Sequence, residues 1–438
     1  MTSELRHEII ALMKREIIPA TGCTEPVAVA LCAAIAASML DESRHAITGV
    51  TCRLSANIVK NAMGVGIPGT GMSGLPIAIA MGTVAGDPAN SLNVLSALSA
   101  DDIDAAKRFV AERPIDITLA DSSCDILYID VTVNAPGHSA RAIIEGNHTN
   151  VTLKEVDGNT VLDLRGGGKN DAAGSGSPAL TMAMVWDLAM NSPLDDIEFI
   201  LESRRLNMAA ADLALHGSYG HSVGRTIGAH SDSSLMGDCI FSRVLARTAA
   251  ACDARMGGAV VPVMSNSGSG NQGIAATVPV CVYAEQTGAD REKTIRALTL
   301  SHLTVIYIKQ SLGRLSALCG CVVAATGSAV GICYLMGGDY RRATSTIKNM
   351  AANLTGMICD GAKPACALKL TSGVSTALIS SMMAMEDHTV SALEGIVDDD
   401  IDTTVSNLTA IGRDAMTQTD RLILSIMTHK KKPVNTPT

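Results

Sequence analysis

Hydrophobic residues recur with two different periods along this chain, and the first period is helical. Near the start they lie three and four positions apart, at Leu5, Ile9, Leu12, Met13 and Ile17. Residues with this spacing share one face of a helix, so the pattern predicts an amphipathic helix that Pro19 ends. A second, alanine-rich helix is predicted from Pro26 to about Leu40, because proline fits the first turn of a helix.

The period then changes to that of strands. Residues 47–58 are predicted to form a strand, and the glycine-rich stretch 60–76 is predicted to be a loop. Ser99, followed by two aspartates, indicates the start of a helix that reaches Glu112. Between residues 115 and 164 short β-type runs are separated by turn sequences, which predicts three or four short strands.

A glycine- and serine-rich segment, residues 166–178, is the strongest linker signal in the chain. Beyond it, long runs of Ala, Leu and Met broken by Gly favour helices. The sequence therefore predicts an α+β N-terminal domain, residues 1–170, followed by a larger all-α helical domain, residues 171–438. The uncharged run 315–338 is long enough to span a membrane, but its many small and polar residues favour a fully buried helix of a soluble protein.

Composition excludes some functions. The 438 residues carry a formal net charge of −9, and only 2% are aromatic. Nucleic-acid binding needs basic surface and stacking side chains, so no nucleic-acid partner is expected. Charged residues are 18% of the chain, below the usual quarter, which predicts extensive burial and a homo-oligomer. With no signal peptide evident at the start, a cytoplasmic location without membrane attachment is expected.

Twelve cysteines in a chain without a secretory signal do not predict a disulfide framework. Cys23 and Cys359 each precede a proline by a few residues and are expected just outside a helix N-terminus, where the helix dipole favours a thiolate. Cys366 falls in the first turn of the second of these helices, and Cys319 and Cys321 open another. Thiolates in this pattern fit an iron–sulfur cluster better than structural zinc. The alternative, that these are buried or incidental cysteines, stays open from spacing alone.

Residues 268–273 match the dinucleotide pattern G-x-G-x-x-G, but no alternating βαβ series follows. A better interpretation is a loop whose backbone amides and polar side chains hold a small carboxylate: Ser265, Asn266 and Asn271. A plain connection between two helices explains the pattern equally well.

Three further residues are candidates for proton transfer. Lys60 and Lys363 lie in glycine-rich surroundings and are suited to be general bases or Schiff-base lysines. His216 lies near a second histidine and is a candidate base or metal ligand. A solvated surface position is the alternative for each of the three.

Five motifs together carry a family resemblance: Thr21–Pro26 (TGCTEP), Ser55–Asn61 (SANIVKN), Ile67–Gly71 (IPGTG), Cys319–Gly327 (CGCVVAATG) and Cys359–Lys363 (CDGAK). In this order they resemble the L-cysteine desulfidase family, which is related to the iron–sulfur L-serine dehydratases. The resemblance covers essentially the whole chain. It implies an oxygen-sensitive [4Fe–4S] lyase that converts the amino acid L-cysteine to pyruvate, ammonia and hydrogen sulfide.

The resemblance also implies a ligand set. Cys23, Cys321 and Cys359 fall where desulfidases place cluster ligands. Cys366 resembles a third cysteine of the serine dehydratase cluster region, although the six residues between Cys359 and Cys366 make the interval shorter, which leaves its role open. A cluster with three cysteine ligands keeps one iron open to act as a Lewis acid on the leaving group.

The remaining site residues follow from the same hypothesis. Lys60, Lys363 and His216 are the candidate bases for the α-proton. Four polar residues in the second and third motifs are predicted to bind the substrate: Ser55, Asn57, Asn61 and Thr70. The alternatives are a serine dehydratase-type deaminase, a pyridoxal-phosphate lyase with the same net reaction, and a non-catalytic amino-acid-binding protein.

Overall fold

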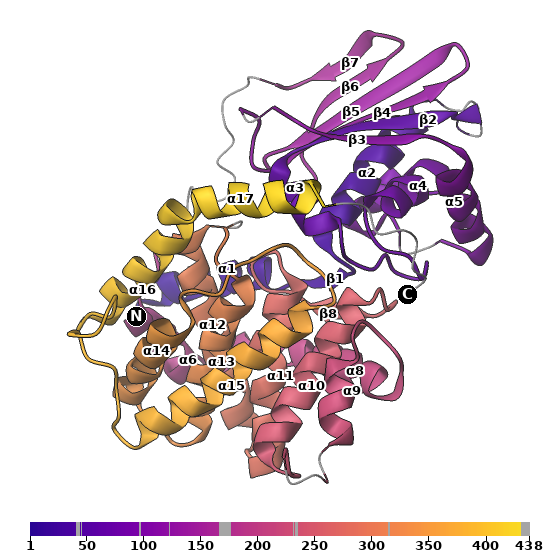
Figure 1. The fold of residues 1–438 in the computed structure, drawn as a ribbon. Coiled ribbons are helices and arrows are strands. Elements are labelled where there is room, and N and C mark those ends of the chain that lie inside the picture. Colours follow the sequence, from indigo (N-terminus) through magenta and orange to yellow (C-terminus); the bar gives the residue numbers. More distant parts are fainter. Residues whose placement is uncertain are drawn as a thin grey trace.

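The fold consists of an α/β part built on a six-stranded sheet and a larger part built of helices (Figure 1). It is a computed structural model. The residues it describes are 1–40, 44, 46–95, 98–121, 123–165, 177–230, 232, 235–313 and 316–430. The predicted combination of an α+β region with a larger helical region is confirmed. The predicted boundary at residue 170 lies outside the described residues and stays a prediction.

The sheet is mixed, with the strand order β3-β2-β4-β5-β6-β7. Only the β2–β3 pair is parallel within it, and the other neighbours are antiparallel. The strands are β2 (Gly49–Leu54), β3 (Ile115–Leu119), β4 (Tyr128–Ala135), β5 (His138–Glu145), β6 (Val151–Val156) and β7 (Asn159–Asp163). The range 115–164 thus forms five strands rather than three or four, because the turn at residues 146–150 separates two strands that the sequence did not divide.

Helices cover one face of this sheet. They are α2 (Thr24–Ser38), α3 (Ala56–Ala62), α4 (Leu75–Val84) and α5 (Ala100–Glu112), with a short 3₁₀ segment at Pro88–Asn93. Helix α2 is apolar on all sides and almost wholly buried, because it lies between α4 and strands β4 and β5. Helix α5 begins as predicted, with Ser99 and Asp102 forming a capping box.

Helix α3 corrects two predictions from the sequence. The strand predicted for residues 47–58 ends at Leu54, and the residues from 60 that were predicted to be loop complete a helix instead. Ser55 is the N-cap of α3, and Ile58, Val59 and Ala62 give the helix a buried face. Lys60 therefore stands on a packed helix and not on a glycine-rich loop.

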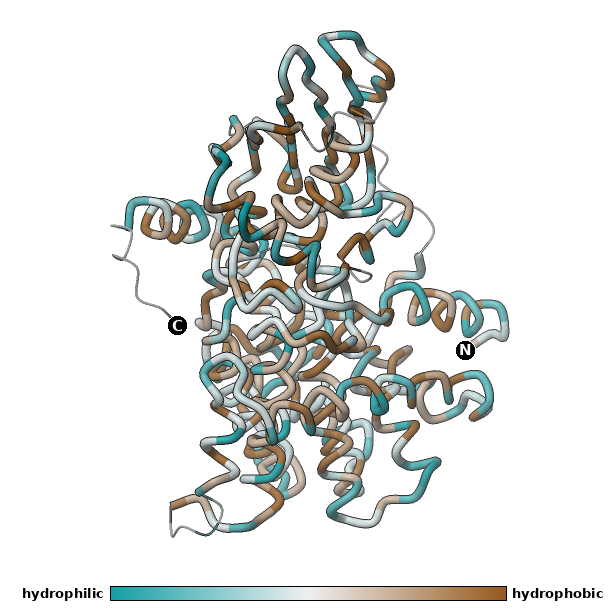
Figure 2. Tube along the Cα trace, turned by 90° about the vertical axis from the view of Figure 1, so that its right-hand side faces the viewer, coloured by the Kyte–Doolittle hydropathy of each residue, from teal (hydrophilic) through white to brown (hydrophobic). Residues whose placement is uncertain are grey.

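The helical part contains most of the remaining elements. Its principal helices are α1 (Ser3–Glu16), α6 (Met182–Asn191), α8 (Leu201–His216), α9 (Val223–Ala229), α10 (Ile240–Met256), α11 (Gly270–Thr287), α12 (Arg291–Leu312), α13 (Gly320–Leu335), α14 (Tyr340–Leu354), α15 (Cys366–Met385) and α16 (Ile401–Ala410). The short α7 (Leu194–Ile197) and a 3₁₀ turn, Glu198–Ile200, connect α6 to α8. Figure 2 shows hydrophobic positions gathered inside and hydrophilic positions on the outer turns.

Helix α13 forms most of the uncharged run that raised the question of a membrane span. Its residues are buried almost without exception, and it packs against α11, α12 and α15. In the described part of the chain, no helix combines the length and the apolar character needed to cross a membrane. The predicted buried helix is confirmed.

Segments near both ends of the chain connect the two parts of the fold. Helix α1 packs Ile9 and Met13 into the core of the helical part. Helix α17 (Thr417–Thr428) follows a π-helical turn, Ile411–Ala415, and returns to pack on α3 of the α/β part (Figure 1). Strands β1 (Pro19–Thr21) and β8 (Pro262–Met264) also pair, which joins the first loop of the chain to the helical part.

Candidate active site

Two cysteine-bearing loops are joined by a β-bridge between Leu318 and Ile358. Cys319 donates its amide hydrogen to the carbonyl of Met357 at 2.9 Å, and Cys359 donates to Ala317 at 2.7 Å. The start of α13 and the loop before α15 are thereby held side by side. This pairing places the two predicted cysteine motifs in one site.

Five thiols are linked to one another, directly or through a shared neighbour, by electrostatic interactions around this bridge. Cys319 and Cys321 stand at the start of α13, Cys366 is the first residue of α15, and Cys252 reaches the group from α10. Cys359 completes the group from the loop. Four of the five are buried and Cys359 is partly buried. The structure thus brings the predicted Cys321, Cys359 and Cys366 together and adds two cysteines.

The first two thiols differ in their proton affinity. Cys321 donates its thiol hydrogen to the sulfur of Cys319, which lowers the pKa of Cys319 and raises the pKa of Cys321. Lys369 adds positive charge nearby, which also lowers the pKa of Cys319. Burial raises the pKa of Cys359, and the negative charge of Cys319 raises it further. Cys319 is therefore the thiol of this pair that most readily becomes a thiolate.

Lys60 lies beside Cys359 and is almost fully buried, with 2% of its surface exposed. Its positive charge lowers the pKa of Cys359. Gly361 has a φ of +88°, and a Cβ at this position would overlap the carbonyl oxygen of Lys60, so only glycine lets the loop approach α3 this closely. The ammonium group of Lys60 forms an ion pair with Asp420 of α17.

Lys363 has a different environment from Lys60. Its ammonium donates to the carbonyls of Asp360 at 2.9 Å and Gly361 at 3.1 Å, and it forms an ion pair with the Asp360 carboxylate. Lys369 binds the same carboxylate. Although burial raises the pKa of Asp360, these two lysines hold it at about 2. Lys363 and Lys369 thus brace the cysteine loop through a permanently charged Asp360.

Cys23 lies at the N-cap of α2 and is buried. Its thiol donates to a carboxylate oxygen of Glu25 at 3.0 Å and approaches the carbonyl of Asn61 at 4.0 Å. Burial and the Glu25 charge raise the pKa of Cys23 well above its ordinary value, whereas Arg255 lowers it. Arg255 acts on Cys252 in the same direction, so its charge influences both Cys23 and a member of the thiol group.

Arg255 and Gln272 are buried polar residues with unsatisfied atoms beside the thiols. Arg255 donates to the side-chain oxygen of Asn271 at 3.0 Å, while its Nε has no hydrogen-bond partner among the described residues. Gln272 packs against Gly320, which lies between Cys319 and Cys321, and its Oε1 is likewise without a partner among the described residues. Buried polar groups are normally paired, so these two atoms are available to a small polar ligand.

The predicted substrate-binding residues near α3 divide into two kinds. The hydroxyl of Ser55 donates to the carbonyl of Ile126 at 2.7 Å, and Thr70 donates within its own turn to Ile67 at 2.8 Å. Both are thus engaged with backbone. Asn57 instead has a buried side-chain oxygen with no partner among the described residues, one turn before Asn61 on the same helix.

The polar loop before α11 is also engaged with its surroundings. Ser265 donates its hydroxyl to the carbonyl of Ile18 at 2.6 Å. The amide nitrogen of Asn266 contacts the ring nitrogen and the carbonyl of His302, both at 3.1 Å, and its oxygen accepts from Ser267. Burial lowers the pKa of His302 to about 3, so this histidine is neutral. Asn271, in the first turn of α11, differs because it contacts Arg255.

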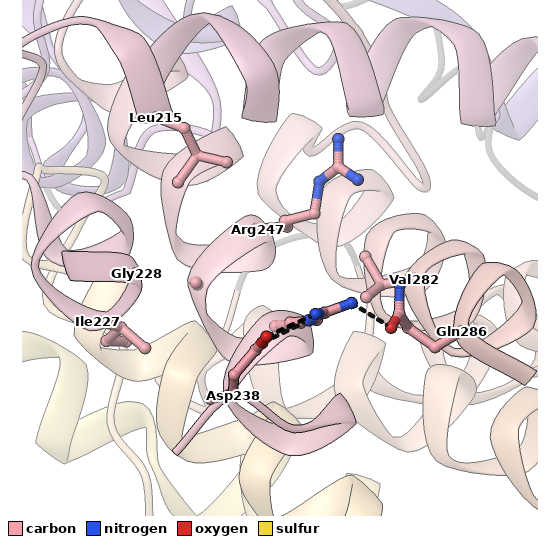
Figure 3. A pocket seen from close by; sticks show the side chains of 10 residues that line it. Leu215, Ile227, Gly228, Asp238, Arg247, Val282 and Gln286 are labelled. Atoms are coloured by element: carbon pink, nitrogen blue, oxygen red, sulfur yellow. Dashed lines mark hydrogen bonds and ion pairs between the residues drawn. The ribbon is translucent and has the colours of Figure 1, made fainter. Parts of the chain in front are cut away.

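His216 lies at the exposed end of α8, where its ring contacts the carbonyl of Asp212 at 2.8 Å. Among the described residues, no hydrogen bond or ion pair connects His216 to the thiol group. A cavity of about 330 Å³ opens near this end of the helix and is lined from α8, α9, α10 and α11 (Figure 3). Asp238 and Gln286 hold the guanidinium of Arg243 across its wall. This cavity contains no cysteine and is separate from the thiol site.

A second cavity, of about 230 Å³, lies where two of the sequence motifs meet. Thr21 lines it from the first motif, and Pro68 and Gly69 line it from the third. Gly22 packs against Pro68, which holds the two loops together. The structure therefore groups the first and third motifs at the junction of the two parts of the fold.

No three side chains of His, Cys, Asp or Glu within the described ranges are already arranged to bind a metal ion. The donor chemistry around the bridge is that of sulfur, with lysines whose charge favours thiolates. Buried thiolates are the ligands of iron–sulfur clusters, so the donor set fits such a group.

Sequence reasoning missed several residues of this site. Cys252 and Arg255 lie in helix α10, after a run of alanines, and both are buried. The only signal in the sequence was an arginine next to this apolar run. Cys319 was noted in its motif but was not among the predicted ligands; the hydrogen bond from Cys321 is the main cause of its lowered pKa. Asp420 gave no local signal, because its partner lies in another part of the chain.

A family model described as the serine dehydratase alpha chain matches residues 89–425, which is more than half of the chain. The chain belongs to the serine dehydratase alpha chain family. A UPF0597 protein of Bacteroides thetaiotaomicron is 54% identical over 430 residues, covering 98% of this chain and 99% of its own length. UPF0597 proteins of Porphyromonas gingivalis and Oleidesulfovibrio alaskensis are 53% and 46% identical, over 98% and 96% of this chain.

Membership of the serine dehydratase alpha chain family indicates a serine-dehydratase-like lyase that acts on a small molecule. The relation to serine dehydratases expected from the five motifs is thereby confirmed. The match spans the starts of α11, α13 and α15, where Gln272, Cys319 and Cys366 lie.

Proposed function

We propose that the protein catalyses α,β-elimination on L-cysteine and uses a [4Fe–4S] cluster held by its cysteines. The products would be pyruvate, ammonia and hydrogen sulfide. The observation that carries this proposal is the convergence of Cys319, Cys321, Cys359 and Cys366 around one β-bridge, with the buried Lys60 beside them. The choice of L-cysteine rests on the five desulfidase-like motifs.

Cys319 and Cys359 are the proposed core of the ligand set, because the bridge holds their loops together and the positive charge of Lys369 acts on both thiols. At Cys359 this charge offsets only part of the rise in pKa that burial causes. Two further thiols are candidates to complete the set, namely Cys366 in the same group and Cys23 at the N-cap of α2. Cys321 would then serve the sulfur of Cys319 as a hydrogen-bond donor. When bound, a cluster with one iron free of cysteine supplies Lewis-acid assistance to the leaving sulfur.

The chain's own residues would bind and orient the amino acid. Arg255 is the proposed partner of the substrate carboxylate, because guanidinium groups bind carboxylates strongly and its Nε is unpaired. Gln272 and Asn57 present unpaired side-chain oxygens that suit the substrate ammonium. Burial of all three polar groups strengthens these interactions by excluding water.

Lys60 is the proposed base for the α-proton, because it is almost fully buried against the cysteine loop, whereas Lys363 belongs to that loop and His216 lies at the exposed end of α8. It would accept the proton as the neutral amine, and Asp420 would stabilise the ammonium that forms. Removal of the α-proton and departure of the sulfur from the β-carbon leave aminoacrylate. Aminoacrylate then takes up a proton at the β-carbon to give the imine, which water hydrolyses to pyruvate and ammonia. Hydrogen sulfide carries away the sulfur.

L-serine is the second candidate substrate, and the match to the serine dehydratase alpha chain family favours it. The same elimination would release water in place of hydrogen sulfide. Anaerobically purified protein assayed with both amino acids decides between them: a higher kcat/KM for L-cysteine supports the proposal, and a higher kcat/KM for L-serine favours the dehydratase. Failure to turn over either amino acid, with iron bound, would favour a non-catalytic binding protein.

A further inference from the structure

Asp420, near the C-terminal end of the chain, forms an ion pair with Lys60, near the N-terminal end. Lys60 is 2% exposed and Asp420 is 23% exposed. Removing a lysine ammonium from water is costly unless an opposite charge compensates it. The burial of Lys60 therefore depends on a carboxylate that arrives with the last helix of the structure.

The helix that carries Asp420 has few other attachments. Ile423 is its one buried residue, and Leu422 and Ile426 are largely exposed. Helix α17 stands out from the side of the body next to the C-terminus and mixes hydrophobic with hydrophilic positions (Figure 2). Its contact with the α/β part lies at α3 and includes Leu424. The ion pair is thus a principal link between α17 and the site.

Lys60 is also fixed from its other side. The close approach of Gly361 holds its carbonyl oxygen against the cysteine loop, while Asp420 holds its ammonium. Gly361 is two residues from Cys359, so this contact keeps Lys60 next to the cysteine loop. The carboxylate therefore sets where the positive charge lies relative to the thiol group.

We propose that Asp420 is a positioning residue that holds the ammonium group of Lys60 at the thiol site. This inference rests on the proposed function, in which Lys60 acts on the substrate. Asp420 itself does not touch the substrate; it acts through Lys60. The C-terminal helix is accordingly part of the active-site architecture, although it is remote from the cysteine motifs in sequence.

Asp420→Asn keeps the size of the side chain and removes its charge. We expect kcat for the amino acid that the wild type turns over to fall about 10- to 100-fold, the size of loss seen when an outer-shell partner of a metal ligand is removed, with KM and iron content little changed. Asp420→Glu should recover part of that loss. Asp414→Asn is the matched control, because Asp414 is an exposed acid just before α17 that pairs with its neighbour Arg413; this variant should keep the wild-type kcat.

Hydrogen exchange of α17 gives a readout that does not depend on turnover. Asp420→Asn and Lys60→Met should both accelerate exchange in residues 417–428, and Asp414→Asn should not. A wild-type kcat in Asp420→Asn would overturn the positioning role. If that variant does not fold, a folded Asp420→Glu is expected to have a kcat below that of the wild type, and an unchanged kcat would overturn the role equally.

The two proposals fail separately. If the wild type turns over neither amino acid, the proposed function fails and the exchange measurement alone decides whether Asp420 holds Lys60. Faster exchange in both single variants would then support the pairing, and unchanged exchange in either would overturn it.

Discussion

Leu318 and Ile358 pair in an isolated antiparallel bridge, and this pairing sets the Cys319 loop against the Cys359 loop. The two loops belong to different helices, α13 and α15, whose packing brings them to the same side of the helical part. The thiol site therefore depends on tertiary packing and not on a local metal-binding sequence. Variants that alter the bridge, its thiols or its contact with α3 test this arrangement.

Cys359→Ala should abolish sulfide release from L-cysteine while leaving the protein folded. Cys359 lies in a loop and is only partly buried, so truncation should cost about 1 kcal/mol of unfolding free energy. Cys32→Ala is the matched control, because Cys32 is buried in α2 within the α/β core. The Cys32→Ala variant should keep its activity, because this substitution changes only the packing of the core. Anaerobic assays with iron quantified check both variants, and near-normal turnover in Cys359→Ala would transfer its proposed role to Cys366.

Cys319→Ala should lower bound iron more than Cys321→Ala does. The thiol of Cys321 donates to the sulfur of Cys319, which makes Cys319 the more acidic of the two. Metal ligation requires the thiolate, so the loss of Cys319 removes a ligand, whereas the loss of Cys321 removes a hydrogen bond to one. Iron content after identical anaerobic purification is the measurement. The reverse order would restore Cys321 to the ligand set expected from the sequence.

Gly361→Ala should disturb the site more than its backbone conformation alone explains. A Cβ at Gly361 would overlap the carbonyl of Lys60 and force the cysteine loop away from α3. Gly337→Ala is the control for strain, because Gly337 has a φ of +95° but open space around its Cβ position. Both substitutions should cost about 1–3 kcal/mol from the left-handed backbone, and only Gly361→Ala should also lower kcat. Equal kcat values in the two variants would argue against close contact between loop and helix.

His302 should make the protein less stable in mild acid. Burial lowers the pKa of His302 to about 3 from an ordinary value near 6.5, so between these values the unfolded chain binds a proton that the folded chain does not. Stability contributed by this group is therefore present above pH 6.5 and lost as the pH falls, by about 2 kcal/mol between pH 7 and pH 5. Urea unfolding at both pH values measures the loss.

The control for this loss is a comparison of two histidine variants. His302→Gln should reduce the difference in unfolding free energy between the two pH values, even if the variant is less stable overall. His7→Gln should not, because His7 is exposed on α1. An unchanged pH dependence in His302→Gln would mean that other groups cause the acid sensitivity.

Local patterns predicted much of the fold. The helix ended by Pro19, the capped helix after Ser99 and the buried run that became α13 all follow from hydrophobic spacing, capping residues and proline. Helix α3 was missed because its seven residues follow a strand directly and are too short for a helical period to show. The paths of α1 and α17 across the two parts depend on packing between distant segments, which no local pattern contains.

The candidate site was predictable where chemistry lies in a motif. Cys359 stood out in a turn before a helix, and Cys321 and Cys366 stood out at helix starts; the structure brings these three thiols together. Lys60 stood out by its motif, whereas its buried state and its partner Asp420 did not, because both arise from contacts between residues far apart in sequence. Asn266 shows the reverse case. The sequence predicted that its side chain holds a small carboxylate, whereas in the structure the side chain is buried and bonded to His302.

The most direct test is the iron and acid-labile sulfide content of the protein purified without exposure to oxygen, measured in the wild type and in Cys359→Ala. The proposed function predicts iron and sulfide in equal amounts in the wild type, at the content of one [4Fe–4S] cluster per chain, together with a loss of both in the variant. Wild-type protein that releases sulfide from L-cysteine while containing neither iron nor labile sulfide would contradict it.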